Sequence, residues 1–331
     1  MIVLIIILYI ILFIYHNINI KKETFINNNS IYNIIKKQKI NKTKYNKNKI
    51  YNEYKNCKNC SLVLYQIKNN NLDIKDKNNI NPRIHNKRID YITSLIKETL
   101  KKYKIGDMIF IVSLRDNLPN LKISYLGPVY EENKNSLAIP SNWWAYFTKS
   151  DNRLFIPSLF DQIINEYKNK NTNQKKDNRI VFRGTNNCEL RRKVRKLSKL
   201  TPKLVDVELP IGKSDKNYIP NDNLISNYQY YFVLRGRGKW TGSINQFSLA
   251  NGTLFKIEEN SKQPIELLLE PDIDYVSINN NLSNFREKVN LVANKNLMNQ
   301  MKNNLEKKSN IFFTSDNIMK YMYYCLINLY D

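Results

Sequence analysis

The stretch that decides the fold reads Val181-Phe182-Arg183-Gly184-Thr185-Asn186-Asn187-Cys188-Glu189-Leu190-Arg191-Arg192-Lys193. Its apolar start predicts a strand over residues 179–183 that ends at an Arg-Gly turn, and a basic helix follows over 189–199. Gly184 lets the backbone approach a ligand without the hindrance of a Cβ atom. The helix N-terminus offers free N–H groups, and Arg191 adds a cation where an anion would have to offset it. The pattern indicates a phosphate-bearing ligand.

The rest of the second half alternates strands with helices. We predict further strands over 203–209, 228–235, 253–257 and 275–278. We predict helices near 243–250, 283–293 and 296–308, and a last helix over 316–330. This alternation is typical of a doubly wound α/β domain.

The first half contains one strong strand. A helix over 88–102 precedes the apolar run 108–114, which predicts a strand buried on both faces of a parallel sheet. Arg115 and Asp116 come directly after it, where open α/β sheets bind their ligands. The aromatic stretch 139–147 is either core or a platform for a sugar. A helix over 158–168 and a polar linker or crossover over 169–178 complete this half.

A second glycine element, Leu234-Arg235-Gly236-Arg237-Gly238-Lys239-Trp240-Thr241-Gly242-Ser243, also follows a predicted strand and precedes a helix. It lacks the spacing of a dinucleotide-binding loop and of a Walker A motif. It is either a surface hairpin tip or a ligand loop. Two Arg-Gly turns at the carboxyl ends of strands in one sheet could clamp a diphosphate without a metal.

The amino-acid composition excludes several classes of function. The chain has 331 residues, enough for two domains, and a formal charge of +24, which raises nucleic acid as a partner. We discount that partner because Lys, Asn and Ile are over-used throughout, and neither a helix-turn-helix pattern nor a Gly-aromatic RNA-binding strand motif occurs. His16 and His85 are the only histidines, which excludes most His-based catalysis and a His₂-carboxylate metal site. Acid–base chemistry must therefore use carboxylates, Tyr or Lys.

The N-terminal sequence predicts that the protein enters the secretory pathway. Residues 1–15 are uncharged and apolar, as in a signal peptide or a short membrane anchor, with a buried strand or helix as the alternative. Residues 16–50 are rich in Asn and Lys, and we predict a disordered tether there. Cys57 and Cys60 form either a local disulfide or two free thiols, because no second pair completes a zinc site.

Several motifs stand in a fixed order. They are Val-Phe-Arg-Gly-Thr at 181–185, Pro-Lys-Leu-Val-Asp at 202–206, Tyr-Gln-Tyr-Tyr-Phe-Val-Leu-Arg-Gly at 228–236, Asn-Gly-Thr-Leu-Phe-Lys at 251–256, Leu-Glu-Pro-Asp-Ile-Asp-Tyr-Val at 269–276 and Asn-Leu-Ser-Asn at 281–284. In this order, with 106–108 and 114–116 also in place, the chain from about Tyr51 onward resembles glycosyltransferase family 90. This capsule-associated family includes protein O-glucosyltransferases that modify epidermal-growth-factor-like repeats.

The resemblance implies a GT-B fold of two facing Rossmann-like domains, with the C-terminal helix packing back on the first. The implied division is an acceptor-side domain at 51–175, a nucleotide-sugar domain at 176–310 and the C-terminal helix at 311–331. The implied reaction is metal-independent and inverting. It moves glucose or xylose from a UDP-sugar to a hydroxyl of a protein, such as a Ser, or of a glycan. The implied location is the lumen of the endoplasmic reticulum or Golgi.

The resemblance also assigns residues. Asp116 matches the general base, and the donor is implied to contact Arg183, Gly184, Thr185, Arg191, Asp206, Gly236 and Ser243. One departure concerns the diphosphate. The family's Ser-x-Arg is replaced here by Ser243-Ile244-Asn245, with Arg237 or Lys239 as possible substitutes. This departure leaves a catalytically silent member that binds a nucleotide-sugar or glycan as the alternative function, and a basic nucleic-acid-binding protein as the third.

Overall fold

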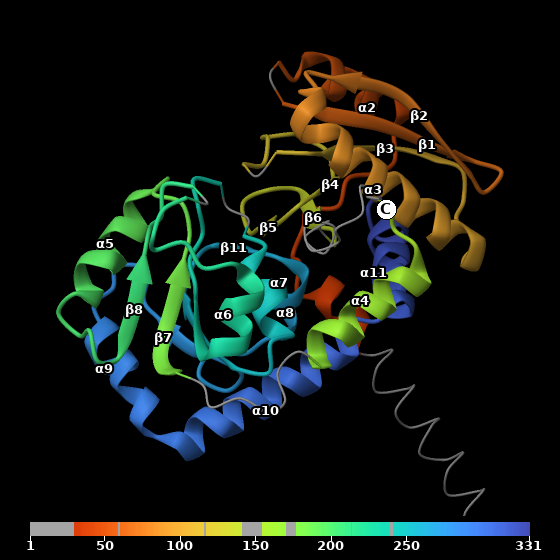
Figure 1. The fold of residues 1–331 in the computed structure, drawn as a ribbon. Helices are drawn as coiled ribbons and strands as arrows, with labels where there is room; N and C mark the ends of the chain where they lie inside the picture. Colours follow the sequence, from red (N-terminus) through yellow and green to blue (C-terminus); the bar gives the residue numbers. More distant parts are fainter. Residues whose placement is uncertain are drawn as a thin grey trace, which may run out of the picture.

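The chain folds into two halves, each built around one β-sheet and covered by helices (Figure 1). The computed structural model describes residues 30–58, 60–115, 117–140, 154–169, 177–212, 214–238 and 241–331. The mixed α/β class predicted from the sequence is confirmed.

The first sheet has the order β2-β1-β3-β4-β6. Its strands are β1 (Leu62–Lys68), β2 (Asn71–Asn78), β3 (Met108–Ser113), β4 (Tyr125–Gly127) and β6 (Ser136–Ala138). Strand β3 is parallel to β4 but antiparallel to β1, which forms a hairpin with β2. The prediction that β3 lies in a parallel sheet is therefore wrong for one of its two neighbours, β1, which belongs to the hairpin.

Burial on both faces of β3 is confirmed. Ile109 and Ile111 face the cluster that includes residues of α2 (Lys47–Asn56), whereas Phe110 and Val112 face the cluster that includes residues of α3 (Pro82–Lys102). Successive side chains of a strand point to opposite faces, so a continuous apolar run is buried only when both faces are covered.

The second sheet is parallel throughout and has the order β12-β10-β9-β7-β8. Its strands are β7 (Asp177–Arg183), β8 (Val205–Glu208), β9 (Tyr228–Val233), β10 (Thr253–Ile257) and β12 (Val276–Ile278). The helical elements between and after them are α5 (Glu189–Ser198), α6 (Asn221–Asn227), α7 (Ser243–Ser248), α8 (Pro264–Leu268), α9 (Phe285–Asn290) and a 3-10 turn (Leu291–Ala293). Each strand predicted from the apolar runs is present.

Two hydrophobic clusters sandwich this sheet. On β7, Val181 belongs to one cluster while Ile180 and Phe182 belong to the other, and on β9 Tyr231 and Phe232 divide in the same way. The sheet is therefore covered on both faces, as the doubly wound pattern predicts.

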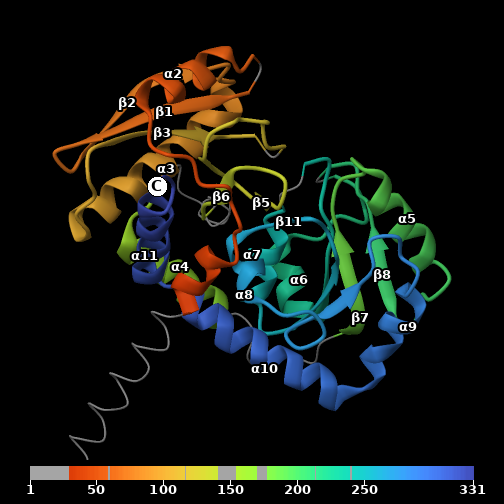
Figure 2. The same cartoon turned by 180° about the vertical axis from the view of Figure 1, so that it is seen from behind.

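Strand pairing and a long helix are among the connections between the two halves. The short strands β5 (Tyr130–Glu131) and β11 (Ser261–Lys262) pair across them. Helix α10 (Lys295–Phe312) runs along the second half, and α11 (Ser315–Ile327) then packs against α3 and α4 (Pro157–Asn169) (Figure 2). The C-terminal helix thus lies on the first half, where it was expected.

The segment before α2 differs from the predicted tether. Residues 30–36 are helical, and Ile31 and Ile34 are buried at 0 and 1 % exposure. Gln38 donates to the hydroxyl of Tyr321 at 2.8 Å and accepts from the backbone N–H of Ala138 at 2.6 Å. The polar composition of this segment led to the prediction of disorder, although it contains a few apolar residues. They are buried because the segment packs near α11, which lies at the far end of the chain.

The membrane-anchor prediction for residues 1–15 lies outside the described part of the chain. Within the described part, no helix has the length and apolar character needed to span a bilayer.

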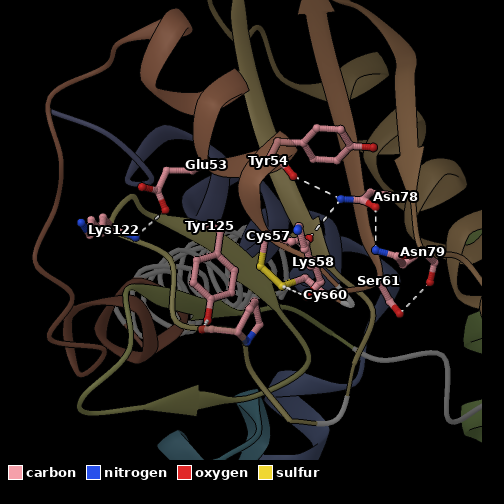
Figure 3. Close-up of a disulfide and its surroundings, with 11 residues drawn as sticks. Glu53, Tyr54, Cys57, Lys58, Cys60, Ser61, Asn78, Asn79, Lys122 and Tyr125 are labelled. Carbon is pink, nitrogen blue, oxygen red and sulfur yellow. Dashed lines mark hydrogen bonds between the residues drawn. A yellow bond between two sulfur atoms is a disulfide. The ribbon is translucent and has the colours of Figure 1, made fainter.

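Cys57 and Cys60 form a disulfide at the end of α2, which resolves the alternatives left by the sequence (Figure 3). The amide of Asn78 donates to the carbonyls of Tyr54 and Cys57, both at 3.2 Å. The disulfide ring therefore lies against the end of β2, next to the start of β1.

Candidate functional site

The two Arg-Gly turns lie side by side at the carboxyl edge of the second sheet. Strand β7 ends at Arg183-Gly184, and β9 is followed by Arg235-Gly236. The two strands are direct neighbours in the sheet. The prediction that both turns follow strands of one sheet is confirmed, and a parallel sheet necessarily places both at one edge.

Close packing excludes a side chain at Gly184 and leaves little room for one at Gly236. A Cβ atom on Gly184 would lie 2.6 Å from Cζ of Phe182 and 3.2 Å from Nη1 of Arg191. A Cβ atom on Gly236 would lie 3.0 Å from Nδ2 of Asn187 and 3.5 Å from Nη2 of Arg191. The backbone of each turn thus approaches side chains that carry hydrogen-bond donors.

Arg191, in the first turn of α5, ties the two turns together. Its Nη1 donates to the carbonyl of Thr185 at 2.9 Å and its Nε donates to the carbonyl of Arg235 at 2.8 Å. Its Nη2 donates to the carbonyl of Leu234 at 3.1 Å. Arg191 is 8 % exposed, and its guanidinium lies over the ring of Phe182. Its planar set of donors is what allows one side chain to hold both loops.

The charge of Arg191 has no carboxylate to balance it in the described part of the chain. Burial lowers the pKa of Arg191, and the one electrostatic partner that opposes this shift is Cys188. The guanidinium nevertheless stays protonated, because its intrinsic pKa exceeds 12. Cys188, the N-cap of α5, makes no side-chain cap. An uncapped helix start and an unbalanced buried cation both favour an anion.

Arg183 and Asp206 are engaged with each other. Nη2 of Arg183 lies 2.7 Å from Oδ1 of Asp206 on the neighbouring strand β8. The same carboxylate accepts from the hydroxyl of Tyr228 at 2.8 Å and lies 3.3 Å from Nη2 of Arg179. This pair, predicted to contact the donor, joins β7, β8 and β9 beneath the turn.

Ser243 begins α7, and its hydroxyl lies 2.8 Å from that of Thr241. Asn245, at the position where the resemblance led us to expect an arginine, is 4 % exposed and donates to Oε1 of Gln263 at 2.9 Å. Its amide therefore points into the protein. Arg237 is exposed, and Lys239 lies outside the described residues.

Asp116, predicted as the general base, also lies outside the described residues, as does most of the aromatic stretch 139–147. The backbone leading to Asp116 is described. Leu114 donates its N–H to the carbonyl of Ser61 at 3.0 Å and accepts from Arg88. The strand end before Asp116 is thus held from two sides.

Glu259 is the site residue that the sequence analysis missed. Its Oε1 lies 2.6 Å from Nε of Arg235, and its side chain is 13 % exposed. Burial outweighs the attraction of Arg235 and raises the pKa of Glu259 to about 7. The signal in the sequence was the pair Glu258-Glu259 directly after a buried strand, at the same sheet edge as the Arg-Gly turns.

Lys256 forms ion pairs with two of the acidic residues near Glu259, namely Glu258 and Glu266. It is 3 % exposed within β10, and its Nζ lies 3.1 Å from Glu258 and 3.3 Å from Glu266. Burial lowers its pKa, but Glu266 and Glu258 outweigh burial and shift the pKa upward. Lys256 therefore stays charged.

A pocket of about 570 Å³ lies between the two halves beside this cluster. Glu259 and Glu266 line it from the second half, and Lys37, Tyr130 and Glu132 line it from the first. Donors, acceptors and one aromatic ring together suit a ligand with many hydroxyl groups. In the described part of the chain, no group of three His, Cys, Asp or Glu is arranged to hold a metal ion.

No protein-family model matches the chain, and a search of curated proteins finds no similar sequence.

Proposed function

We propose that the protein is a glycosyltransferase that moves a sugar from a UDP-sugar to a hydroxyl group, with inversion and without a metal. The observation that carries the proposal is the buried guanidinium of Arg191, which bridges two Arg-Gly turns at one sheet edge and has no carboxylate partner among the described residues. An anion placed there would meet the turns, the start of α5 and unbalanced positive charge. A diphosphate carries charge of the required sign.

In the proposed reaction, the acceptor oxygen attacks the anomeric carbon while the bond from that carbon to the diphosphate breaks. The electron pair of that bond leaves on UDP, and the proton of the acceptor hydroxyl passes to the carboxylate of Asp116. A hydroxyl is a weak nucleophile unless a base is placed beside it. Positive charge at the turns would stabilise the diphosphate as it leaves, which is the role a metal fills elsewhere.

A GT-B arrangement is part of this proposal. It is supported by the presence of one sheet in each half, by the pocket between the halves and by the return of α11 to the first half. In this arrangement the donor occupies the edge of the second sheet and the acceptor approaches from the first half.

The proposed location is the lumen of the endoplasmic reticulum or Golgi. The Cys57–Cys60 disulfide supports this location, since disulfides persist in oxidising compartments. The proposed partners are UDP-glucose or UDP-xylose and a secreted protein or glycan acceptor, with the membrane contacted through residues 1–15.

A second candidate function is binding of a nucleotide-sugar or glycan without transfer. Two observations favour it. Asn245 is turned inward where the family has an arginine, and Arg183 is occupied by Asp206. Both reduce the positive charge available to the departing diphosphate.

The experiment that tests the proposal measures thermal stability and donor hydrolysis of the full chain with UDP-glucose, UDP-xylose and UDP alone, in EDTA. The full chain is used because Ile31 and Gln38 pack within the fold. Stabilisation with turnover of one sugar supports the transferase, and stabilisation without turnover supports the silent binder. If UDP has no effect, both are wrong. The variant Asp116→Asn should lose turnover and keep UDP binding.

A further inference from the structure

The ion pair between Arg235 and Glu259 joins the ends of two neighbouring strands at the candidate site. Arg235 follows β9, and Glu259 follows β10, its parallel neighbour. Their side chains meet at 2.6 Å with exposures of 35 and 13 %. The arginine is thus partly open to solvent, whereas the carboxylate is mostly enclosed.

The backbone of Arg235 is held firmly while its side chain has a single carboxylate partner among the described residues. The carbonyl of Arg235 accepts from Nε of Arg191 at 2.8 Å and from Sγ of Cys188 at 3.4 Å. Gly236 then packs against Asn187. Arg235 belongs to the second of the two turns, so its guanidinium would have to leave Glu259 before it could pair with an anion there.

We propose that Glu259 is a displaceable counter-ion, which holds Arg235 when the site is empty and releases it to a diphosphate when Glu259 takes up a proton. This inference rests on the proposed function, because it names Arg235 as the side chain that takes the place of the family's missing arginine. The positive charge of Arg235 then becomes available to the ligand.

The groups around Glu259 are of both signs. Those in direct electrostatic contact are Arg235 on the β9 turn, Lys256 and Glu258 on and after β10, and Glu266 on α8. Those that line the same pocket are Lys37, Lys39, Glu132, Lys262 and Glu270, with Tyr130 between them. Lys256 is already shared by Glu258 and Glu266, so Arg235 is the main cation that attracts Glu259.

The proton uptake falls in an accessible pH range. Burial raises the pKa of Glu259 to about 7, with Glu266 and Glu258 adding to the shift and Arg235 opposing it. Below that pH the carboxyl is neutral and attracts Arg235 weakly. Linkage to one proton with a pKa near 7 weakens donor binding up to about tenfold between pH 6 and pH 8.

The test measures the affinity of the full chain for UDP-glucose by calorimetry at pH 6 and pH 8. UDP-glucose is suitable because its diphosphate diester does not titrate in this range. We expect wild type to bind about tenfold more tightly at pH 6 than at pH 8. We expect Glu259→Gln to bind at both pH values as wild type does at pH 6. The control Glu287→Gln removes the same charge from an exposed position on α9, outside the pocket, and should behave as wild type.

Binding of UDP-glucose that is independent of pH in wild type, or unchanged by Glu259→Gln, would overturn the counter-ion role and leave the proposed function standing. If UDP-glucose does not bind at all, the proposed function fails and sulfate, which also keeps its charge over this range, becomes the probe. The Nε–H signal of Arg235 in NMR spectra, identified with Arg235→Lys, should then move with sulfate in Glu259→Gln at pH 8. It should not move in wild type at pH 8. A signal that moves in neither protein would also overturn the proposal.

Discussion

Nη2 of Arg183 lies 2.7 Å from Oδ1 of Asp206, and this ion pair joins the last residue of β7 to the second residue of β8. The exposures of the two side chains are 8 and 13 %, so the pair is mostly removed from water. Tyr228 on β9 donates to the same carboxylate. Two residues predicted to contact a ligand therefore also join three neighbouring strands of the sheet, β7, β8 and β9.

Replacing Asp206 by Asn should destabilise the fold. The change leaves the guanidinium of Arg183 buried without its counter-charge, which costs roughly 3–5 kcal/mol. Urea unfolding followed by circular dichroism measures the change. The control is Asp177→Asn, whose side chain is 32 % exposed and pairs with Arg179, and it should lose less than about 1 kcal/mol. Equal losses in the two variants would contradict the structural role of Asp206.

Replacing Arg191 by Lys should separate the two Arg-Gly turns although the charge is kept. A lysine ammonium cannot reach the carbonyls of Thr185, Leu234 and Arg235 together. We expect a loss of about 2 kcal/mol in unfolding free energy and a loss of UDP binding. Arg192→Lys is the matched control, because Arg192 is exposed. If Arg191→Lys keeps full UDP affinity, the bridging role is wrong.

Gly184→Ala should lower the stability of the fold, whereas Gly106→Ala should leave it nearly unchanged. The new Cβ at residue 184 would lie 2.6 and 2.8 Å from two ring atoms of Phe182, whereas nothing lies within 4 Å at residue 106. Overpacking of this kind costs about 1–3 kcal/mol. Thermal unfolding compares the two variants. The double variant Phe182→Leu with Gly184→Ala should recover part of the loss, and no recovery would show that another contact is responsible.

Glu259→Gln should make the stability of the protein less dependent on pH. The pKa of Glu259 rises on folding from 4.5 to about 7. Between these values the folded state binds the proton more tightly, so its stability falls as the pH rises through this window. The loss is about 3 kcal/mol by pH 8. Glutamine lacks this titration. The unfolding free energy of the variant, relative to that of wild type, should therefore be higher at pH 8 than at pH 4. Urea unfolding at both pH values gives the difference, and parallel pH profiles would contradict it.

Reducing the Cys57–Cys60 disulfide should lower the stability by about 2 kcal/mol, because the bond closes a short loop. Urea unfolding with and without dithiothreitol measures the effect. The double variant Cys57→Ser with Cys60→Ser serves as the control and should not respond to the reductant. Cys188 and Cys325 are free cysteines, so a response in that variant would have another origin.

Local sequence determined much of the fold. Consecutive apolar residues within 179–183, 228–235 and 253–257 divide between the two hydrophobic clusters, because successive side chains of a strand point to opposite faces and both faces of this sheet are covered. Arg-Gly after two of these strands placed both turns at one edge, because all strands of a parallel sheet end there.

Only the tertiary structure decided which side chains of neighbouring strands meet. The sheet order places β7 between β8 and β9, so Arg183 finds Asp206 rather than solvent. The burial of Glu259 beside Arg235 depends on β10 lying next to β9 and on the second half meeting the first. The contact of residues 30–38 with α11 joins segments that lie almost a whole chain apart. Partners of this kind are fixed by spatial neighbours, whereas a local pattern determines only which elements form and where each of them ends.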